Sequence, residues 1–211
     1  MSKLKKIPAK NMEVRTQVKD SKFYASIFAV QNRAEAEKRI SEIRNKYADA
    51  THNVPAFRVE NPKLDQEALE YYDDDGEPAG SSGPPILEAI KGKNLLNTVI
   101  IVTRYFGGTK LGIGGLIRAY GDTARLAIEK AGIEKLEEFY QIEIKTPFAK
   151  VGIVLGQLEA LEAEINESKY DNQGAIVSAV IKTELKNKFE KIIKEKTGAD
   201  YKLKILKSIY K

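Results

Sequence analysis

The densest group of side chains that could carry chemistry lies between Tyr71 and Gly83, with the sequence YYDDDGEPAGSSG. Its clustered carboxylates could hold Mg²⁺ or another hard cation. They could also act as general acid and base if neighbouring charges separate their pKa values. Asp-Gly and Glu-Pro are equally typical of tight turns, and Ser81 and Ser82 could cap a following helix. The spacing matches no dedicated metal loop, so no metal ligands are assigned.

A second segment, TRYFGGTKLGIGGLIRAY from Thr103 to Tyr120, places five glycines between a predicted strand and a predicted helix. Successive N–H groups in such a loop can form an anion site together with the helix N-terminus. The spacing fits neither a Walker A loop nor a dinucleotide fingerprint. The predicted anion-binding residues are Gly107, Gly108, Lys110, Gly112, Gly114, Gly115 and Arg118.

The glycines have an alternative role, which is to allow tight packing of the helix against the strand. Arg104 decides between the two readings, because it could supply counter-charge to a bound anion. If the acidic turn at Asp73–Glu77 folds over the loop, Arg104 instead pairs with a carboxylate and the glycines serve packing alone.

The third segment is ATHNVPAFR, from Ala50 to Arg58, which holds the only histidine of the chain. A single histidine is more often structural than catalytic, and His52 has no neighbour in the sequence that would complete a Ser-His-Asp triad. Ser82 and Asp74 stay open as partners in space. No catalytic residue is assigned.

Charge is segregated along the 211 residues, whose net charge is +5. Eight acidic residues and no basic ones lie between Leu64 and Glu88, whereas the segment from Lys182 to Lys211 has ten lysines and four acidic residues. Such basic surfaces attract phosphates. We expect nucleic-acid contacts from Lys202, Lys204 and Lys207, although solvated helix and strand faces would give the same composition.

Composition excludes several classes of protein. The absence of cysteine rules out disulfides, thiolate zinc sites and iron–sulfur clusters. No apolar stretch approaches the ~20 residues that span a bilayer, and no apolar region follows the basic N-terminus as in a secretory signal. We therefore expect a cytoplasmic protein with no membrane partner, and the residues call for no cofactor.

The pattern of apolar residues predicts two unlike halves. The first is mixed α/β, with strands at 12–18, 22–30, 51–60, 68–72 and 98–103. Its helices are expected after Asn32, from Pro84–Pro85 and after the glycine loop. The second has the order βαββαβ of a ferredoxin-like sandwich. Its elements are expected at 140–146, 147–163, 165–170, 175–183, 185–196 and 201–209. The boundary is expected near Glu134–Glu138.

Taken together, the ordered motifs resemble the YigZ/IMPACT family over about residues 15–132. The resemblance rests on Lys22-Phe23, Ala50–Asn53 with Ala56–Arg58, Asp74–Pro78, Gly80–Leu87, Val102–Gly108 and Lys110–Leu116. The chain departs from the family pattern at Ala79, Ser81-Ser82 and Val54, which argues against a serine nucleophile. The motif residues that would form a shared site are Lys22, His52, Asn53, Arg58, Asp74, Asp75, Glu77, Ser82 and Arg104.

The resemblance implies an α+β protein with an S5-domain-2-like N-terminal domain, residues 1–136. A ferredoxin-like domain similar to elongation factor G domain V would follow, residues 137–211. Eukaryotic relatives regulate translation by competing for the activator of a stress kinase. The expected function is therefore a non-enzymatic, translation-linked regulator that binds RNA, the ribosome or a protein partner.

The alternative is an enzyme acting on a phosphorylated or peptide-like small molecule. Its site would collect His52, Asp74, Glu77 and Arg104. The sequence gives no oligomeric state. Convergence of these side chains in one pocket would favour a small ligand, whereas scatter over a basic face would favour a macromolecule.

Overall fold

The computed structural model describes residues 4–61 and 67–211. Residues 1–3 of the basic N-terminus and Asp65 of the acidic run lie outside the described residues. The chain forms two compact units, one made of Lys6–Lys135 and the other chiefly of Leu136–Lys211. With sheets and helices in both units, it is an α+β protein.

A five-stranded antiparallel sheet forms the frame of the first unit, in the order β2-β3-β6-β4-β5. Its strands are β2 (Met12–Val18), β3 (Ser21–Ala29), β4 (His52–Val59), β5 (Leu69–Tyr72) and β6 (Thr98–Tyr105). The predicted hairpin of β2 and β3 is confirmed. The β-branched strand β6 is central and buried over nearly its whole length, as its sequence predicts.

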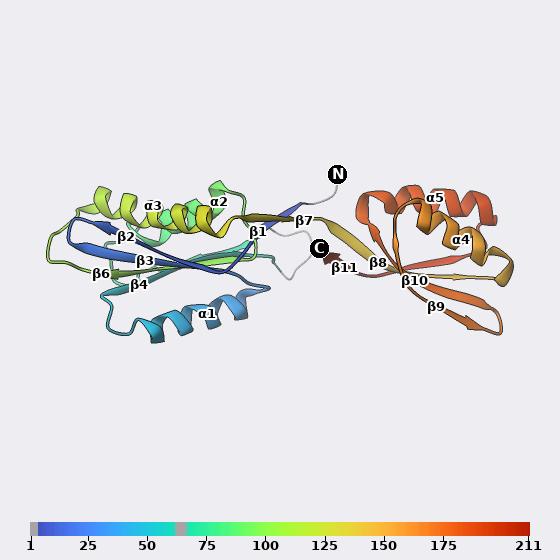
Figure 1. Cartoon of the computed structure of the whole chain (residues 1–211), viewed down its shortest axis with the longest axis horizontal. Coiled ribbons are helices and arrows are strands. Elements are labelled where there is room, and N and C mark those ends of the chain that lie inside the picture. Colours follow the sequence, from blue (N-terminus) through green and yellow to red (C-terminus); the bar gives the residue numbers. More distant parts are fainter. Residues whose placement is uncertain (1–3, 62–66) are drawn as a thin grey trace. The chain divides into compact units, whose positions relative to one another are not determined.

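Helices cover both faces of this sheet (Figure 1). α2 (Gly83–Gly92) and α3 (Ile113–Ala131) pack on one face, and α1 (Arg33–Lys46) packs on the other. The predicted cap of α1 is present, because the Asn32 side chain accepts a hydrogen bond from Glu35 N. The Glu35 carboxylate reaches back to Gln31 N, one residue earlier than in a standard capping box.

Two short strands were not predicted. β1 (Lys5–Pro8) and β7 (Ile133–Leu136) form a separate two-stranded sheet. Each has four residues and carries charged side chains, so neither shows the apolar alternation that indicates a strand. Part of the charged stretch expected to be a boundary is therefore regular structure.

The second unit contains β8 (Glu138–Thr146), α4 (Phe148–Ala160), β9 (Glu164–Asp171), β10 (Gly174–Lys182), α5 (Lys186–Thr197) and β11 (Lys202–Tyr210). The predicted order βαββαβ is confirmed, with a short 3₁₀ turn at Thr183–Leu185 before α5. α4 ends three residues before the expected Ala163, and Glu162 adopts a positive φ of 54° just beyond it.

Both helices of this unit pack on one face of an antiparallel sheet with strand order β11-β8-β10-β9 (Figure 1). β11 is therefore an edge strand. None of the helices within residues 4–61 and 67–211 has the length and apolar character that crossing a bilayer requires.

Candidate functional site

A buried ion pair forms the centre of the motif residues. Arg104 Nη1 lies 2.6 Å from Glu77 Oε1, and both side chains are at least nine-tenths buried. The same carboxylate oxygen accepts a hydrogen bond of 2.7 Å from the Tyr120 hydroxyl of α3. Arg104 Nη2 donates to Ser21 Oγ at 3.2 Å. The acidic turn thus folds onto β6, and Arg104 takes a carboxylate partner.

His52 joins this cluster from the neighbouring strand, because β4 places it directly opposite Arg104. Its Nδ1 lies 2.7 Å from the backbone oxygen of Asp75. A carbonyl oxygen only accepts, so Nδ1 carries the proton and donates. Nε2 then lies 3.8 Å from Glu77 Oε1, and about a fifth of the side chain is exposed. His52 therefore ties the acidic turn to the sheet.

Asp74 organises the start of α2. Its carboxylate accepts hydrogen bonds from Gly80 N, Ser82 N, Gly83 N and Ser82 Oγ, at 2.7 to 3.0 Å. Pro84 and Pro85 follow in the first turn and have no N–H group. Asp74 therefore accepts from the backbone N–H groups that are available at the start of the helix. Asp74 consequently caps α2, although it lies eight residues before Ser82 in the sequence.

The predicted capping role of the serines is therefore wrong. Ser82 occupies the N-cap position, but its side chain makes no capping bond. Its hydroxyl donates to Asp74 Oδ1, and Ser81 Oγ donates to the carbonyl of Pro78. The nearby carboxylate is a stronger acceptor than a hydroxyl, so it takes the N–H groups that Ser82 would otherwise bind.

The remaining carboxylates of the turn are also engaged. Asp75 Oδ2 accepts from Asn53 N at 2.7 Å, and Asp75 Oδ1 lies 3.1 Å from Arg44 Nη2. Asp73 Oδ1 accepts from Asp75 N, and its other oxygen lies 3.4 Å from the same arginine. Among residues 4–61 and 67–211, no group of three or more acidic or histidine side chains is arranged to hold a metal ion.

The Asp74 cap predicts a dependence on pH. Burial raises the pKa of the Asp74 carboxyl, but hydrogen bonds from Gly80, Gly83 and Ser82 outweigh burial and hold the pKa below its usual range. A carboxylate whose pKa falls on folding stabilises the fold above its unfolded pKa, and that contribution is lost as the pH falls through the folded pKa.

We expect Asp74→Asn to lower the free energy of unfolding by about 0.5 to 2 kcal/mol at pH 7, because the amide keeps one oxygen acceptor but loses the charge that strengthens these hydrogen bonds. The difference from wild type should shrink as the pH falls below about 4. Urea unfolding across this pH range checks the prediction. A difference that stayed constant down to pH 2 would show that the charge of Asp74 is irrelevant.

The side chains of three motif residues do not join the cluster. Lys22 follows Ser21 and precedes Phe23 on β3, so it points to the opposite face of the sheet and is exposed. Asn53 likewise points to the α1 face, where it bonds to Tyr47 O and Thr103 Oγ1. Arg58 lies six residues along β4 from His52, about 20 Å away, and pairs with Glu70.

Arg104 pairs with Glu77 of the acidic turn, which is the arrangement expected if the glycines of the loop serve packing. A Cβ on Gly107 would lie 2.0 Å from the backbone oxygen of Asp20, so only glycine fits there. Gly108 and Gly112 have φ of 94° and 70°, and Gly112 caps α3. Because Arg104 is bound to Glu77, it does not face an anion at the loop. Anion binding at the start of α3 stays a prediction.

Sequence reasoning missed two members of the cluster, Tyr120 and Ser21. The Tyr120 ring belongs to the apolar core under α3 and packs edge-on against Phe23. A fully buried tyrosine hydroxyl needs a hydrogen-bond partner, and that requirement was the available signal. Burial and the nearby Glu77 carboxylate raise the pKa of Tyr120 far above its usual value, so it remains a donor.

In the second unit, the three lysines predicted to bind nucleic acid share one face. Ile142 and Ile144 of β8 are buried under the helices, so Gln141, Glu143 and Lys145 point to the opposite, uncovered face. Lys207, Lys204 and Lys202 lie directly opposite these three residues. All three lysines are exposed. We call this surface the outer sheet face.

An irregularity in β11 makes this alignment possible. Lys204 and Lys207 are three residues apart and would point to opposite faces of a regular strand. The register with β8 shifts between Ile205 and Lys207, so Leu206 is an extra residue. This bulge returns Lys207 to the face of Lys204.

Comparison with known proteins identifies the family. The model of the Impact N-terminal domain matches residues 19–128, which contain the whole buried cluster. The chain belongs to the IMPACT family.

Relatives support this assignment over most of the chain. The IMPACT family member YvyE of Bacillus subtilis is 33% identical over 153 residues, covering 72% of this chain and 69% of the relative. The IMPACT family member YigZ of Escherichia coli is 27% identical over 164 residues, covering 78% and 79%. A crystal structure of a hypothetical protein superimposes with a TM-score of 0.66 at 23% identity, covering 98% of each chain, which shows a shared fold.

Proposed function

We propose that this IMPACT family protein is a non-enzymatic, translation-linked factor that docks on RNA, most directly ribosomal RNA, through the outer sheet face. The observation that carries the proposal is the alignment of Lys202, Lys204 and Lys207 on a face that no helix within residues 4–61 and 67–211 covers. Lysine neutralises phosphates without reading sequence, so the face fits structured RNA of varied sequence. The expected compartment is the cytoplasm.

The proposal includes the finer fold assignment. We assign the first unit to the S5-domain-2-like type and the second to the ferredoxin-like type. The strand order β11-β8-β10-β9 supports the latter, because it places the fourth and first strands of a βαββαβ unit side by side, followed by the third and the second. Residues 1–136 and 137–211 are the corresponding domains.

The buried cluster supports binding over catalysis. Its carboxylates serve as a helix cap at Asp74, an ion-pair partner at Glu77 and a strand anchor at Asp75. A general acid or base needs a group that can exchange its proton with a substrate. These groups are already committed to holding the acidic turn against the sheet.

The enzyme alternative rests on one contact, the 3.8 Å separation of His52 Nε2 and Glu77 Oε1 at the rim of the cluster. A phosphorylated or peptide-like substrate would have to reach His52 there. A protein partner in place of RNA is the other alternative, and the following experiment separates it from the main proposal.

We expect the affinity for a structured RNA to fall steeply with salt, with a log–log slope of about −0.7 to −0.9 per phosphate neutralised. Changing Lys202, Lys204 and Lys207 to Ala should flatten that slope by roughly 2 to 3. Fluorescence anisotropy with a labelled RNA hairpin at several salt concentrations measures both.

A matched control removes the same charge from the first unit, where Lys38, Lys93 and Lys130 are also exposed. That triple variant should retain the wild-type slope. Binding that is independent of salt, or equal losses in the two triple variants, would refute docking through the outer sheet face.

A further inference from the structure

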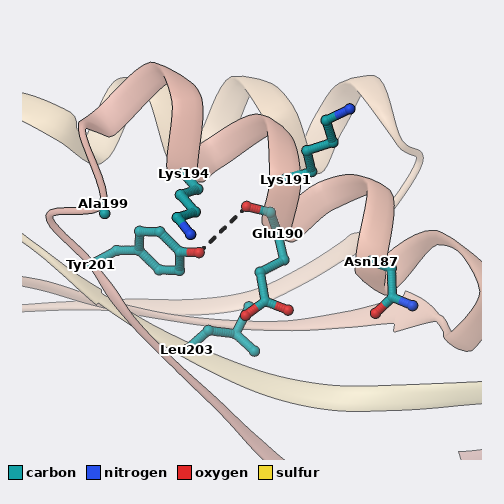
Figure 2. Close-up of a pocket in the computed structure, with 7 residues that line it drawn as sticks. All are labelled: Asn187, Glu190, Lys191, Lys194, Ala199, Tyr201 and Leu203. Atoms are coloured by element: carbon teal, nitrogen blue, oxygen red, sulfur yellow. Dashed lines mark hydrogen bonds between the residues drawn. The ribbon is translucent and has the colours of Figure 1, made fainter.

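An open groove runs between α5 and the start of β11, on the helix-covered side of the second sheet (Figure 2). One wall is a single face of α5, formed by residues at helical spacing, and the other wall precedes and begins the edge strand. The lining residues are Asn187, Glu190, Lys191 and Lys194 on the helix, and Ala199, Tyr201 and Leu203 opposite. The cavity volume is about 630 Å³, enough for several side chains of a bound segment.

The groove combines an apolar floor with a charged helical wall. Leu203 is half-buried against the core of the second unit, and the Tyr201 ring is held in place because its hydroxyl donates to the backbone oxygen of Glu190. The Glu190 carboxylate is occupied by Lys186 on the same helix. Lys191 and Lys194 are exposed at the groove.

The strand beside the groove can accept a further strand. β11 pairs with β8 along one side, and no other strand of the described chain pairs with its second side. An edge strand of nine residues leaves backbone N–H and C=O groups available to an extended segment. Peptides that add a strand in this way gain affinity from backbone hydrogen bonds and specificity from side chains that enter an adjacent groove.

Charge specifies the chemistry of the occupant. Within the fully described segment Lys186–Lys211, Lys186 pairs with Glu190 and Lys211 pairs with Glu164. The other lysines form no ion pair, and this segment contains just three acidic residues. The lysines without an ion pair are Lys188, Lys191, Lys194, Lys196, Lys202, Lys204 and Lys207. A segment that binds beside β11 therefore lies close to unpaired lysines of both α5 and β11.

We propose that the groove between α5 and β11 binds an extended acidic segment of a protein partner. The segment pairs with β11 as an added strand, places apolar side chains over Tyr201 and Leu203, and directs carboxylates to Lys191 and Lys194. RNA fits the groove less well, because a phosphate backbone cannot pair with a strand edge and gains nothing from the Leu203 floor. The groove does not require RNA docking in order to bind a segment, although both surfaces include β11.

The probe is a fluorescein-labelled short peptide of alternating glutamate and valine, tested against the full chain by anisotropy. We expect Lys191→Ala with Lys194→Ala to weaken binding by about 3- to 10-fold. The matched control, Lys188→Ala with Lys196→Ala, removes the same charge from the same helix at residues that do not line the groove. It should change the affinity less than about twofold.

A second measurement tests strand addition itself. The same peptide methylated on alternate backbone nitrogens cannot donate to β11, so it should lose most of its affinity while keeping its charge. In the full chain, amide shifts on adding the unmethylated peptide should appear along Lys202–Lys207 and at the lining residues of α5.

Three results would overturn the proposal. The first is absence of binding at low salt, and the second is equal losses in the two lysine pairs. The third is an RNA of equal charge that competes for the groove lysines and is weakened by the same substitutions as the peptide, because that behaviour identifies a general polyanion surface.

Discussion

Replacing Glu77 by Ala should lower the free energy of unfolding of the first unit by about 3 to 5 kcal/mol, because the Arg104 charge would remain buried without a partner. The Tyr120 hydroxyl would lose its acceptor as well. The chain has no tryptophan, so amide hydrogen exchange of β6 residues under urea is a suitable measurement, and it separates the first unit from the second.

A double variant distinguishes loss of the pair from loss of the carboxylate alone. Glu77→Leu combined with Arg104→Met removes both charges and keeps apolar volume, and should recover most of the stability lost in Glu77→Ala. If Glu77→Ala cost less than about 1 kcal/mol, water would be reaching the arginine and the cluster would not be the buried anchor described above.

Replacing Gly107 by Ala should also destabilise the first unit. The added methyl group would lie 2.0 Å from Asp20 O and 2.2 Å from the carbonyl carbon of the same residue. Because the obstacle is backbone, the loop and the β2–β3 turn have to separate. Overpacking of this kind costs about 1 to 3 kcal/mol or more. Thermal unfolding and the hydrogen exchange of Thr109 and its neighbours measure the effect.

Gly114→Ala provides the matched control. Gly114 lies in the first turn of α3, and a Cβ there would meet only the flexible end of Arg118, at 3.7 Å. Alanine favours helix over glycine, so this variant should be as stable as wild type or gain up to ~1 kcal/mol. Comparable losses in the two variants would mean that the loop needs glycine for a reason other than the approach to Asp20.

The sequence was most informative where a regular apolar pattern was bounded by residues that favour the start or end of a helix or strand. The β-branched run of β6, the Asn32 cap and the prolines at the start of α2 all marked elements that the structure confirms. The βαββαβ order of the second half followed from the same rules. β1 and β7 were not predicted, because short charged strands lack the apolar alternation that indicates a strand.

The site was harder to predict because its geometry depends on contacts between distant residues. The motif singled out Asp74, but its role as the cap of α2 depends on a turn that brings the carboxylate back onto Gly80–Gly83. Lys22 and Arg58 belong to the same motifs yet lie on another face and at another strand end. Register decides such questions, and register is set by strand pairing rather than by spacing in the sequence.

The outer sheet face illustrates the same limit. Counting lysines identified the basic segment, whereas the bulge at Leu206 aligns Lys204 with Lys207. Nothing in the sequence between Ile205 and Lys207 marks this bulge, because bulges arise from pairing with the neighbouring strand. A regular β11 would have divided the three lysines between the two faces.

The most direct test of the proposed function is an amide chemical-shift map of the full chain titrated with a structured RNA. RNA docking through the outer sheet face predicts shifts along Lys202–Lys207 and at Gln141–Lys145 of β8, which diminish as salt is raised. His52, Glu77 and Gly107–Gly115 should remain unperturbed. Shifts confined to those residues of the first unit, with β8 and β11 unchanged, would contradict the proposal and move the functional site to the buried cluster.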